Sequence, residues 1–137
     1  MIMAERAFPP RVAIAERVAS EAGFQQGCIP EVGRLLRLAA ASKPHGLVAE
    51  SGTGAGVGTA WLHSGLGAGA RLVTVERDEE LARRAAGVFA DDDRVSVLTG
   101  DWRLLERHAP FDVSSATAGA SGTTPRGLSN CWLPVAF

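Results

Sequence analysis

The fold of this chain is decided by residues 47–58, which read LVAESGTGAGVG. The apolar start of this stretch predicts a short strand over 47–49, and the glycines after it predict a tight turn into a helix over 59–66. In a doubly wound parallel sheet, such a turn lies at the carboxyl ends of the strands, where ligands bind. Because glycine has no side chain, a ligand can approach the main chain closely here. The turn is therefore the candidate binding site.

The sequence on either side of this turn alternates between helix and strand patterns. The remaining predicted elements are helices over 11–22, 30–42 and 78–90 and strands over 71–76, 95–98 and from 111 onward. Strands separated by helices indicate a parallel sheet with right-handed crossovers. The sequence thus predicts an α/β fold, an incomplete Rossmann-like doubly wound sheet preceded by two helices.

The composition excludes several classes of protein. The chain has 137 residues, 46% of them hydrophobic, which suits one small globular domain. A net charge of −1 from 14 basic and 15 acidic residues gives no reason to expect a nucleic acid or an acidic membrane as partner. Two cysteines at opposite ends of the chain predict neither a disulfide scaffold nor a zinc site. No apolar run reaches the roughly 18 residues of a membrane helix, so we expect a cytoplasmic protein.

Two common phosphate-binding patterns do not fit the glycine turn. A dinucleotide fingerprint needs glycines in the first, third and sixth places, but the sixth place is Val57 counted from Gly52 and Thr59 counted from Gly54. A P-loop needs a lysine at the start of the helix, and no lysine follows Lys43. The sequence therefore argues against a P-loop protein and against a nicotinamide-dependent oxidoreductase.

Three carboxylates are expected around the turn. Glu50 precedes the glycines, Glu76 ends the next strand, and Asp101 follows the third strand. A carboxylate at the end of the second strand can accept both hydroxyls of an unphosphorylated ribose. Asp101 can accept from an adenine amino group, and the neighbouring Trp102 offers an apolar face. The three acids would surround a cationic adenosine ligand.

Taken together, these motifs resemble the class I S-adenosylmethionine-dependent methyltransferases, in particular the small O-methyltransferases related to the catechol and caffeoyl-CoA enzymes. The residues that carry the resemblance lie within 28–113 and read PEVGRLL at 30–36, LVAESGTGAGVG at 47–58, VTVE at 73–76 and TGD at 99–101. The resemblance implies methyl transfer from S-adenosylmethionine to a small-molecule acceptor. Ser51 departs from the family, which usually has an aliphatic residue at this position.

Carried over position by position, the resemblance implies a set of cofactor-binding residues. The turn would line the methionine and ribose, with Glu50 near the methionine ammonium and Glu76 on the ribose hydroxyls. The full implied set is Glu50, Gly52, Thr53, Gly54, Gly56, Gly58, Glu76, Arg77, Asp101 and Trp102, the last three of which would contact or flank the adenine. No residue is assigned as catalytic and none as a metal ligand. The resemblance implies a magnesium ion in the metal-using members among intact relatives, and its site is not expected in this chain.

The sequence changes character after Val113. Residues 114–127 are almost wholly small or polar and show no period, so we expect an irregular tail over 114–137. The cofactor-binding part is then 1–113, with a helical lead-in over 1–43. Reading the codons one nucleotide out of register turns residues 130–133 into Leu-Leu-Ala or Leu-Leu-Val, as the family continues, so a frameshift near Val113 is our hypothesis. Such a truncation would expose the apolar edge of the fourth strand and favour self-association through it.

Two functions remain open from the sequence. The first is the cofactor-binding part of an S-adenosylmethionine-dependent methyltransferase that acts on an oxygen of a small molecule. The second is a truncated binding module, or a decayed gene product, without catalysis. Binding of S-adenosylhomocysteine, compared with binding of NAD, is the measurement that separates them from an oxidoreductase.

Overall fold

In the computed structural model, which describes residues 8–25, 27–117 and 132–135, helices and strands alternate in the predicted order. The elements are α1 (Pro10–Glu21), α2 (Pro30–Ala41), β1 (Leu47–Ser51), α3 (Val57–Gly65), β2 (Arg71–Glu76), α4 (Glu79–Val88), β3 (Val95–Thr99), the 3-10 helix η1 (Trp102–His108), β4 (Val113–Thr117) and β5 (Trp132–Val135). Helices α1 and α2 each begin at a proline, whose fixed φ suits the first helical turn. At the start of α4, the side chain of Asp78 accepts a hydrogen bond from the amide of Leu81.

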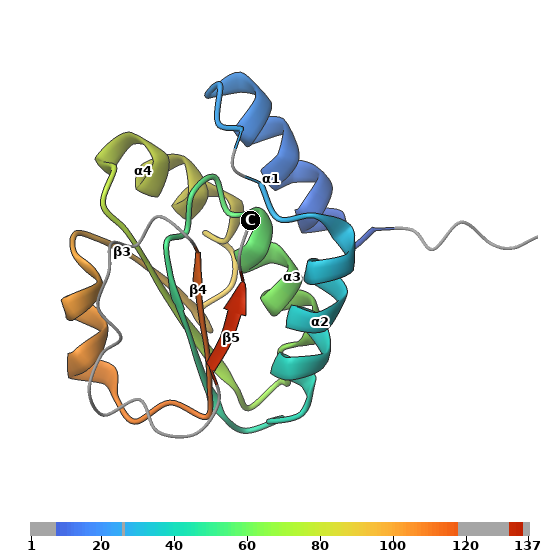
Figure 1. Ribbon diagram of the computed structural model, residues 1–137, viewed down its shortest axis with the longest axis vertical. Helices are drawn as coiled ribbons and strands as arrows, with labels where there is room; N and C mark the ends of the chain where they lie inside the picture. Colours follow the sequence, from blue (N-terminus) through green and yellow to red (C-terminus); the bar gives the residue numbers. More distant parts are fainter. Residues whose placement is uncertain (1–7, 26, 118–131, 136–137) are drawn as a thin grey trace, which may run out of the picture.

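The five strands form one parallel sheet in the order β3-β2-β1-β4-β5 (Figure 1). The chain runs outward from β1 to β2 and β3, and then returns to the other side of β1 to form β4. The carboxyl ends of β1 and β4 therefore flank the point where the direction of winding reverses, which is where open α/β sheets bind ligands. The predicted doubly wound, Rossmann-like sheet is confirmed.

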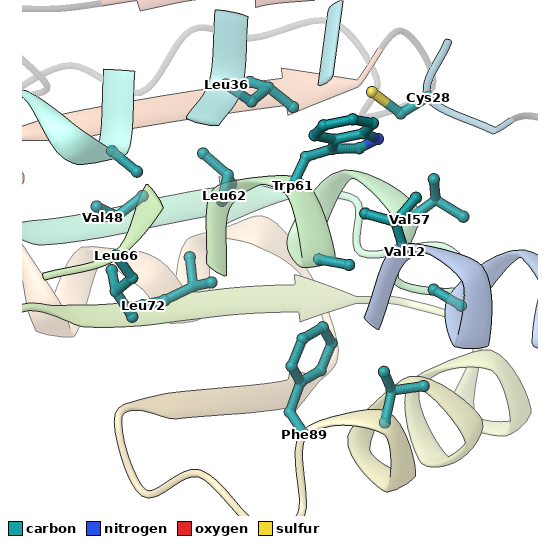
Figure 2. Packing of buried hydrophobic residues seen from close by; sticks show 14 of the residues in the cluster. Val12, Cys28, Leu36, Val48, Val57, Trp61, Leu62, Leu66, Leu72 and Phe89 are labelled. Carbon is teal, nitrogen blue, oxygen red and sulfur yellow. The ribbon is translucent and has the colours of Figure 1, made fainter. Parts of the chain in front are cut away.

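Successive residues of each strand face two different layers. Val48 and Leu72 join a cluster with residues of α1, α2 and α3, whereas Ala49 and Val73 join a second cluster on the other face. Figure 2 shows the first cluster, in which Trp61 and Leu62 of α3 lie among side chains from the other helices and the strands. Helix α3 contacts both α1 and α2, so it forms the centre of this layer.

The second face of the sheet is covered by η1. Leu105 of η1 and Phe111 pack with Ala49, Val73 and Val75. The side chain of Asp101 caps η1 by accepting from the amide of Arg103. This helix was not predicted from the sequence, because seven residues in a 3-10 conformation are too short to show a helical period.

Two expectations about the C-terminal part are wrong where the structure describes it. Residues 114–117 do not begin an irregular tail, because they continue β4, which pairs with β1 from Val48↔Val113 to Ser51↔Ala116. Strand β5 pairs with β4, so the outer edge of β4 is not exposed. Pairing between neighbouring strands places these residues in the sheet, although the small side chains of 114–117 show no strand pattern. The remainder of the expected tail, 118–131 and 136–137, lies outside the described residues.

Candidate functional site

The glycine turn between β1 and α3 combines left-handed backbone conformations with hydrogen bonds to β2. Gly52, Gly54 and Gly56 have φ values of 90°, 57° and 98°, a region that other residues rarely adopt. The amides of Gly52 and Thr53 both donate to the carbonyl of Val75, at 2.9 and 3.1 Å. These bonds hold the turn against the carboxyl end of β2, so the predicted turn lies at the carboxyl edge of the sheet.

Glu50 is buried beside this turn in a cluster of threonines. The residue is 2% exposed, and its Oε1 accepts from the hydroxyls of Thr59 and Thr74, the latter at 2.8 Å. The hydroxyl of Thr74 also lies 2.6 Å from that of Thr53 in the turn. Burial raises the pKa of Glu50 to about 7, and the two hydroxyl hydrogen bonds oppose this rise. The charge of Glu50 near pH 7 is therefore set by the balance between its burial and its two threonine hydrogen bonds.

Thr59 and Thr74 were not predicted from the sequence as site residues. Both are fully buried, and Thr74 stands between apolar neighbours in the middle of β2. A buried hydroxyl in such a strand needs a hydrogen-bond partner, and this requirement is the signal that could have found it. Its partner is decided by the sheet, because the parallel register places Glu50 opposite Thr74.

Glu76 joins the end of β2 to the glycine turn. Its Oε1 accepts from the amide of Gly54 at 2.9 Å, and its Oε2 accepts from the amide of Asp78 at 2.8 Å. Each carboxylate oxygen has two lone pairs, so each oxygen can also accept a hydroxyl from a ligand. The two amides fix the orientation of the carboxylate at the edge where the sequence predicted ribose binding.

Arg77 and Asp101 meet at the carboxyl ends of β2 and β3. Nη2 of Arg77 lies 3.3 Å from Oδ2 of Asp101, and Oδ1 accepts from the amide of Arg103 at 3.0 Å. This amide hydrogen bond, assisted by the charges of the two arginines, lowers the pKa of Asp101 below its usual value. Trp102 packs against the second cluster, and the guanidinium of Arg103 lies 5.4 Å from its ring centroid. The predicted adenine-binding residues are therefore neighbours, with Asp101 ionised.

A hollow of about 600 Å³ lies beside Asp101. Its lining residues are Thr99, Gly100, Asp101, Arg103, Leu104, Glu106 and Arg107. They come from the end of β3 and from η1, so Asp101 is the one predicted site residue among them. The hollow borders the expected adenine end of the site and does not reach the glycine turn.

Close contacts with other side chains explain why glycine occupies position 54 in the turn and position 58 in α3. A β-carbon on Gly54 would lie 2.7 Å from the ring of Phe24, so this ring, from the segment between α1 and α2, rests on the turn. A β-carbon on Gly58 would lie 2.9 Å from Oε2 of Glu50. The sequence did not predict Phe24 as a site residue, because only the packing of the helices brings it to the turn.

His63 is bonded to Asp92, in the segment between α4 and β3. His63 lies near the end of α3, away from the turn, and its Nε2 is 2.7 Å from Oδ2 of Asp92. The same Asp92 oxygen accepts from Arg94 at 2.7 Å. Within residues 8–25, 27–117 and 132–135, no group of three His, Cys, Asp or Glu side chains could hold a metal ion. None of the helices in these ranges is both long enough and apolar enough to cross a membrane.

Comparison with known families gives a match over most of the chain. The model of the protein-L-isoaspartate(D-aspartate) O-methyltransferase family matches residues 30–131, from α2 through the glycine turn, Glu76 and Asp101. The chain belongs to this family. The methyltransferase resemblance seen in the sequence is confirmed, although the family that matches bears a different name from the catechol and caffeoyl-CoA branch. No curated protein matches the sequence closely enough to count as a relative.

Solved structures of methyltransferases share the fold. An O-methyltransferase from Bacillus cereus, in complex with SAH, is 27% identical with a TM-score of 0.71, over 82% of this chain and 56% of that one. A methyltransferase from Geobacter sulfurreducens is 25% identical with a TM-score of 0.72, over 88% and 62% of the two chains. A protein-L-isoaspartate O-methyltransferase, at 21% identity and a TM-score of 0.56 over 64% and 28%, shares the fold. This family member thus spans less than two thirds of each of these proteins.

Proposed function

We propose that this chain binds S-adenosylmethionine at the glycine turn, as the cofactor-binding part of a methyltransferase that methylates an oxygen of a small molecule. The observation that carries the proposal is the hydrogen bond from the amide of Gly54 to Glu76, because it joins the proposed ribose acceptor directly to the glycine turn. The Bacillus cereus O-methyltransferase, which shares the fold, is in complex with SAH. Its 27% identity over 82% of this chain supports the same ligand here.

The residues at this edge fit a cationic adenosine ligand. Glu50, Glu76 and Asp101 come from or directly follow three neighbouring parallel strands, so all three carboxylates lie toward one edge of the sheet. Among the described residues, Arg77 and Arg103 both pair with Asp101, at 3.3 and 3.9 Å, so three carboxylates face two guanidinium groups and the group is net negative when all three are ionised. S-adenosylmethionine carries a sulfonium and an ammonium charge, and fixed carboxylates in a partly buried site stabilise such charges.

In the proposed complex, each predicted residue has a defined part. Glu76 accepts the ribose hydroxyls, Glu50 stabilises the methionine ammonium through the turn, and Asp101 accepts from the adenine amino group. Trp102 and Arg77 flank the base. Backbone and small side chains of the turn line the methionine and ribose portion, namely Gly52, Thr53, Gly54, Gly56 and Gly58.

The chemistry follows from this placement. When bound, the cofactor supplies a methyl group on a positively charged sulfur. The residues of this chain hold that sulfur in a fixed position and orientation, which is the main source of rate enhancement when two reactants must meet in line. Removal of the proton from the acceptor oxygen needs a general base, and no described residue is assigned to that role.

Calorimetry with the full chain tests the proposed cofactor. We expect S-adenosylhomocysteine to bind with measurable heat and NAD to give none. Binding of NAD without S-adenosylhomocysteine would overturn the proposal in favour of an oxidoreductase. If neither S-adenosylhomocysteine nor NAD gives any heat of binding, the decayed gene product is favoured. If S-adenosylhomocysteine binds but no methyl group is transferred, the truncated binding module is favoured.

The family match supports a second class of acceptor. The family is named for L-isoaspartate and D-aspartate in proteins, so its acceptor is a carboxylate of a peptide chain. An assay with labelled S-adenosylmethionine should offer a small hydroxylated aromatic compound and an isoaspartyl peptide in parallel. We expect label on the small molecule; label on the peptide alone would replace the small-molecule acceptor by the peptide.

The division of the chain is also a proposal. We propose that residues 1–113 form the cofactor-binding part, with the helical lead-in over 1–43, and that residues 114–137 are read out of frame. The support is the Leu-Leu-Ala or Leu-Leu-Val obtained from residues 130–133 in the shifted register. The nucleotide sequence around Val113 tests it, because an absence of an open shifted frame would overturn it.

We base the proposed partners and cellular location of the protein on its net charge and composition. The net charge of −1 supports the expectation that no nucleic acid takes part, and the two distant cysteines support a cytoplasmic location. Since β5 covers β4, self-association would use β3 or β5, the outer strands of the sheet. Sedimentation at several protein concentrations measures that association.

A further inference from the structure

Thr74 is a hydroxyl residue in the centre of an otherwise apolar buried strand. Its neighbours along β2 are Val73 and Val75, and Thr74 itself is fully buried. Valine has nearly the same shape as threonine and a strong preference for such strands, so packing alone gives no reason for the hydroxyl. The hydroxyl is instead bonded on both sides, to Oε1 of Glu50 at 2.8 Å and to the hydroxyl of Thr53 at 2.6 Å.

This pair of bonds connects the buried acid to the glycine turn. Thr53 belongs to the turn and its amide is held by the carbonyl of Val75, while Glu50 lies in β1, opposite Thr74 in the register. Thr59, from the first turns of α3, donates to the same Oε1 from the other side. Oε1 of Glu50 therefore accepts hydrogen bonds from a hydroxyl of β2 and a hydroxyl of α3. The β2 hydroxyl, that of Thr74, is also hydrogen-bonded to Thr53 in the turn.

We propose that Thr74 is a positioning residue that holds the Glu50 carboxylate ready for a cation at the glycine turn. The proposal rests on the proposed function, since the cation is the ammonium of the adenosine ligand. A hydroxyl that donates to a carboxylate stabilises its ionised form more than its protonated form. Thr74 thus couples the charge of Glu50 to the turn that surrounds the ligand.

Burial and one neighbouring acid act on Glu50 in the opposite sense to Thr74. Glu76, at the end of β2, carries a like charge that disfavours ionisation of Glu50, as burial does. Cys28, from the segment before α2, approaches the same region, and burial together with the charge of Glu50 raises the pKa of its thiol to about 12. The thiol is therefore neutral and offers no compensating charge. Among the described residues of α3, Thr59 is the one that bonds the carboxylate.

The test compares wild type, Thr74→Val and Thr74→Ser in calorimetric titrations with S-adenosylhomocysteine from about pH 5.5 to 8.5. Wild-type affinity should fall as the pH drops through the pKa of Glu50, about 7. We expect T74V to weaken binding about tenfold at pH 7 and to move the midpoint of this fall to higher pH. T74S keeps the hydroxyl and should restore both the affinity and the midpoint.

A double-mutant cycle separates positioning from a general loss of structure. In a Glu50→Gln background there is no carboxylate to ionise, so T74V should add little further loss of affinity. If T74V does not fold, Thr74→Ala, which introduces no bulk, carries the same expectation. If wild type binds S-adenosylhomocysteine and T74V has the same affinity and the same pH midpoint, the role of Thr74 is overturned but the proposed function is not. Wild type that binds no S-adenosylhomocysteine would overturn the proposed function, and this inference with it.

Discussion

Oε1 of Glu76 lies 2.9 Å from the amide nitrogen of Gly54, so the acid that ends β2 is bonded to the middle of the turn that follows β1. The two residues belong to separate sequence motifs. Parallel pairing of β1 with β2 brings both strand ends to the same edge of the sheet. One side chain therefore orients the turn and faces the proposed ligand, which makes the edge sensitive to substitution at either residue.

Replacing Glu76 by alanine removes both the ribose acceptor and the bond to Gly54. We expect S-adenosylhomocysteine to bind more weakly by about 1–3 kcal/mol, since hydrogen bonds to a charged group are lost. Calorimetry measures the change. Glu79→Ala, in the exposed first turn of α4, is the matched control and should bind as wild type does. If E76A retains full affinity, Glu76 does not contact the ligand.

Alanine at Gly54 should destabilise the fold, whereas alanine at Gly87 should stabilise it. Gly54 has a φ of 57°, and its β-carbon would meet the ring of Phe24 at 2.7 Å, so we expect a loss of about 1–3 kcal/mol. Gly87 lies in α4 with nothing within 4 Å of its β-carbon, so G87A should add up to about 1 kcal/mol through helix propensity. Urea unfolding of both variants checks this. If G54A and G87A change the free energy of unfolding by similar amounts, Gly54 is not held in a left-handed conformation against Phe24.

The charge of Glu50 should make stability depend on pH. Its folded pKa, about 7, lies above the ordinary value of 4.5, so the folded state retains a proton that the unfolded state has lost between these values. The free energy of unfolding should therefore fall as pH rises from about 4.5 to about 7, by up to about 3 kcal/mol. Glu50→Gln, which mimics the protonated acid, should remove this slope and be more stable than wild type at pH 8. Parallel pH profiles for the two proteins would contradict the burial of an ionisable Glu50.

Gly33 should be intolerant of any side chain because α2 packs closely on α3. A β-carbon there would lie 2.3 Å from the indole ring of Trp61, which is 2% exposed. We expect Gly33→Ala to destabilise the fold by about 1–3 kcal/mol, despite the better helix propensity of alanine. Thermal unfolding measures the loss.

The smaller ring of phenylalanine at position 61 provides the control for this contact. Within the described residues, the indole Nε1 of Trp61 is buried without a hydrogen-bond partner, so Trp61→Phe removes no hydrogen bond. The double variant G33A/W61F should lose less stability than the sum of the two single variants. Strict additivity would show that the helix contact is not the cause.

The sequence predicted the α-helices α1 to α4, the first three strands and the doubly wound sheet, because each of these has a local cause. The glycines at 52, 54 and 56 predicted a tight turn, and glycine is the residue type that tolerates the left-handed conformations found there. Glu76 and Asp101 could be placed near them, because parallel strands bring their carboxyl ends to one edge. The end of β4 and the whole of β5 were not predicted, since residues 114–117 are small or polar and show no strand pattern. Pairing with β1 and with each other places these two strands in the sheet.

The sequence by itself therefore determined the class of fold, the position of the turn and the acids around it. Only the tertiary structure decided how those acids are held. The bond from Thr74 to Glu50 depends on the register of two strands, and the contact of Phe24 with Gly54 depends on how α1 and α2 pack. Residue type and spacing act along the chain, whereas these contacts join segments about 24 to 30 positions apart, which no local pattern encodes.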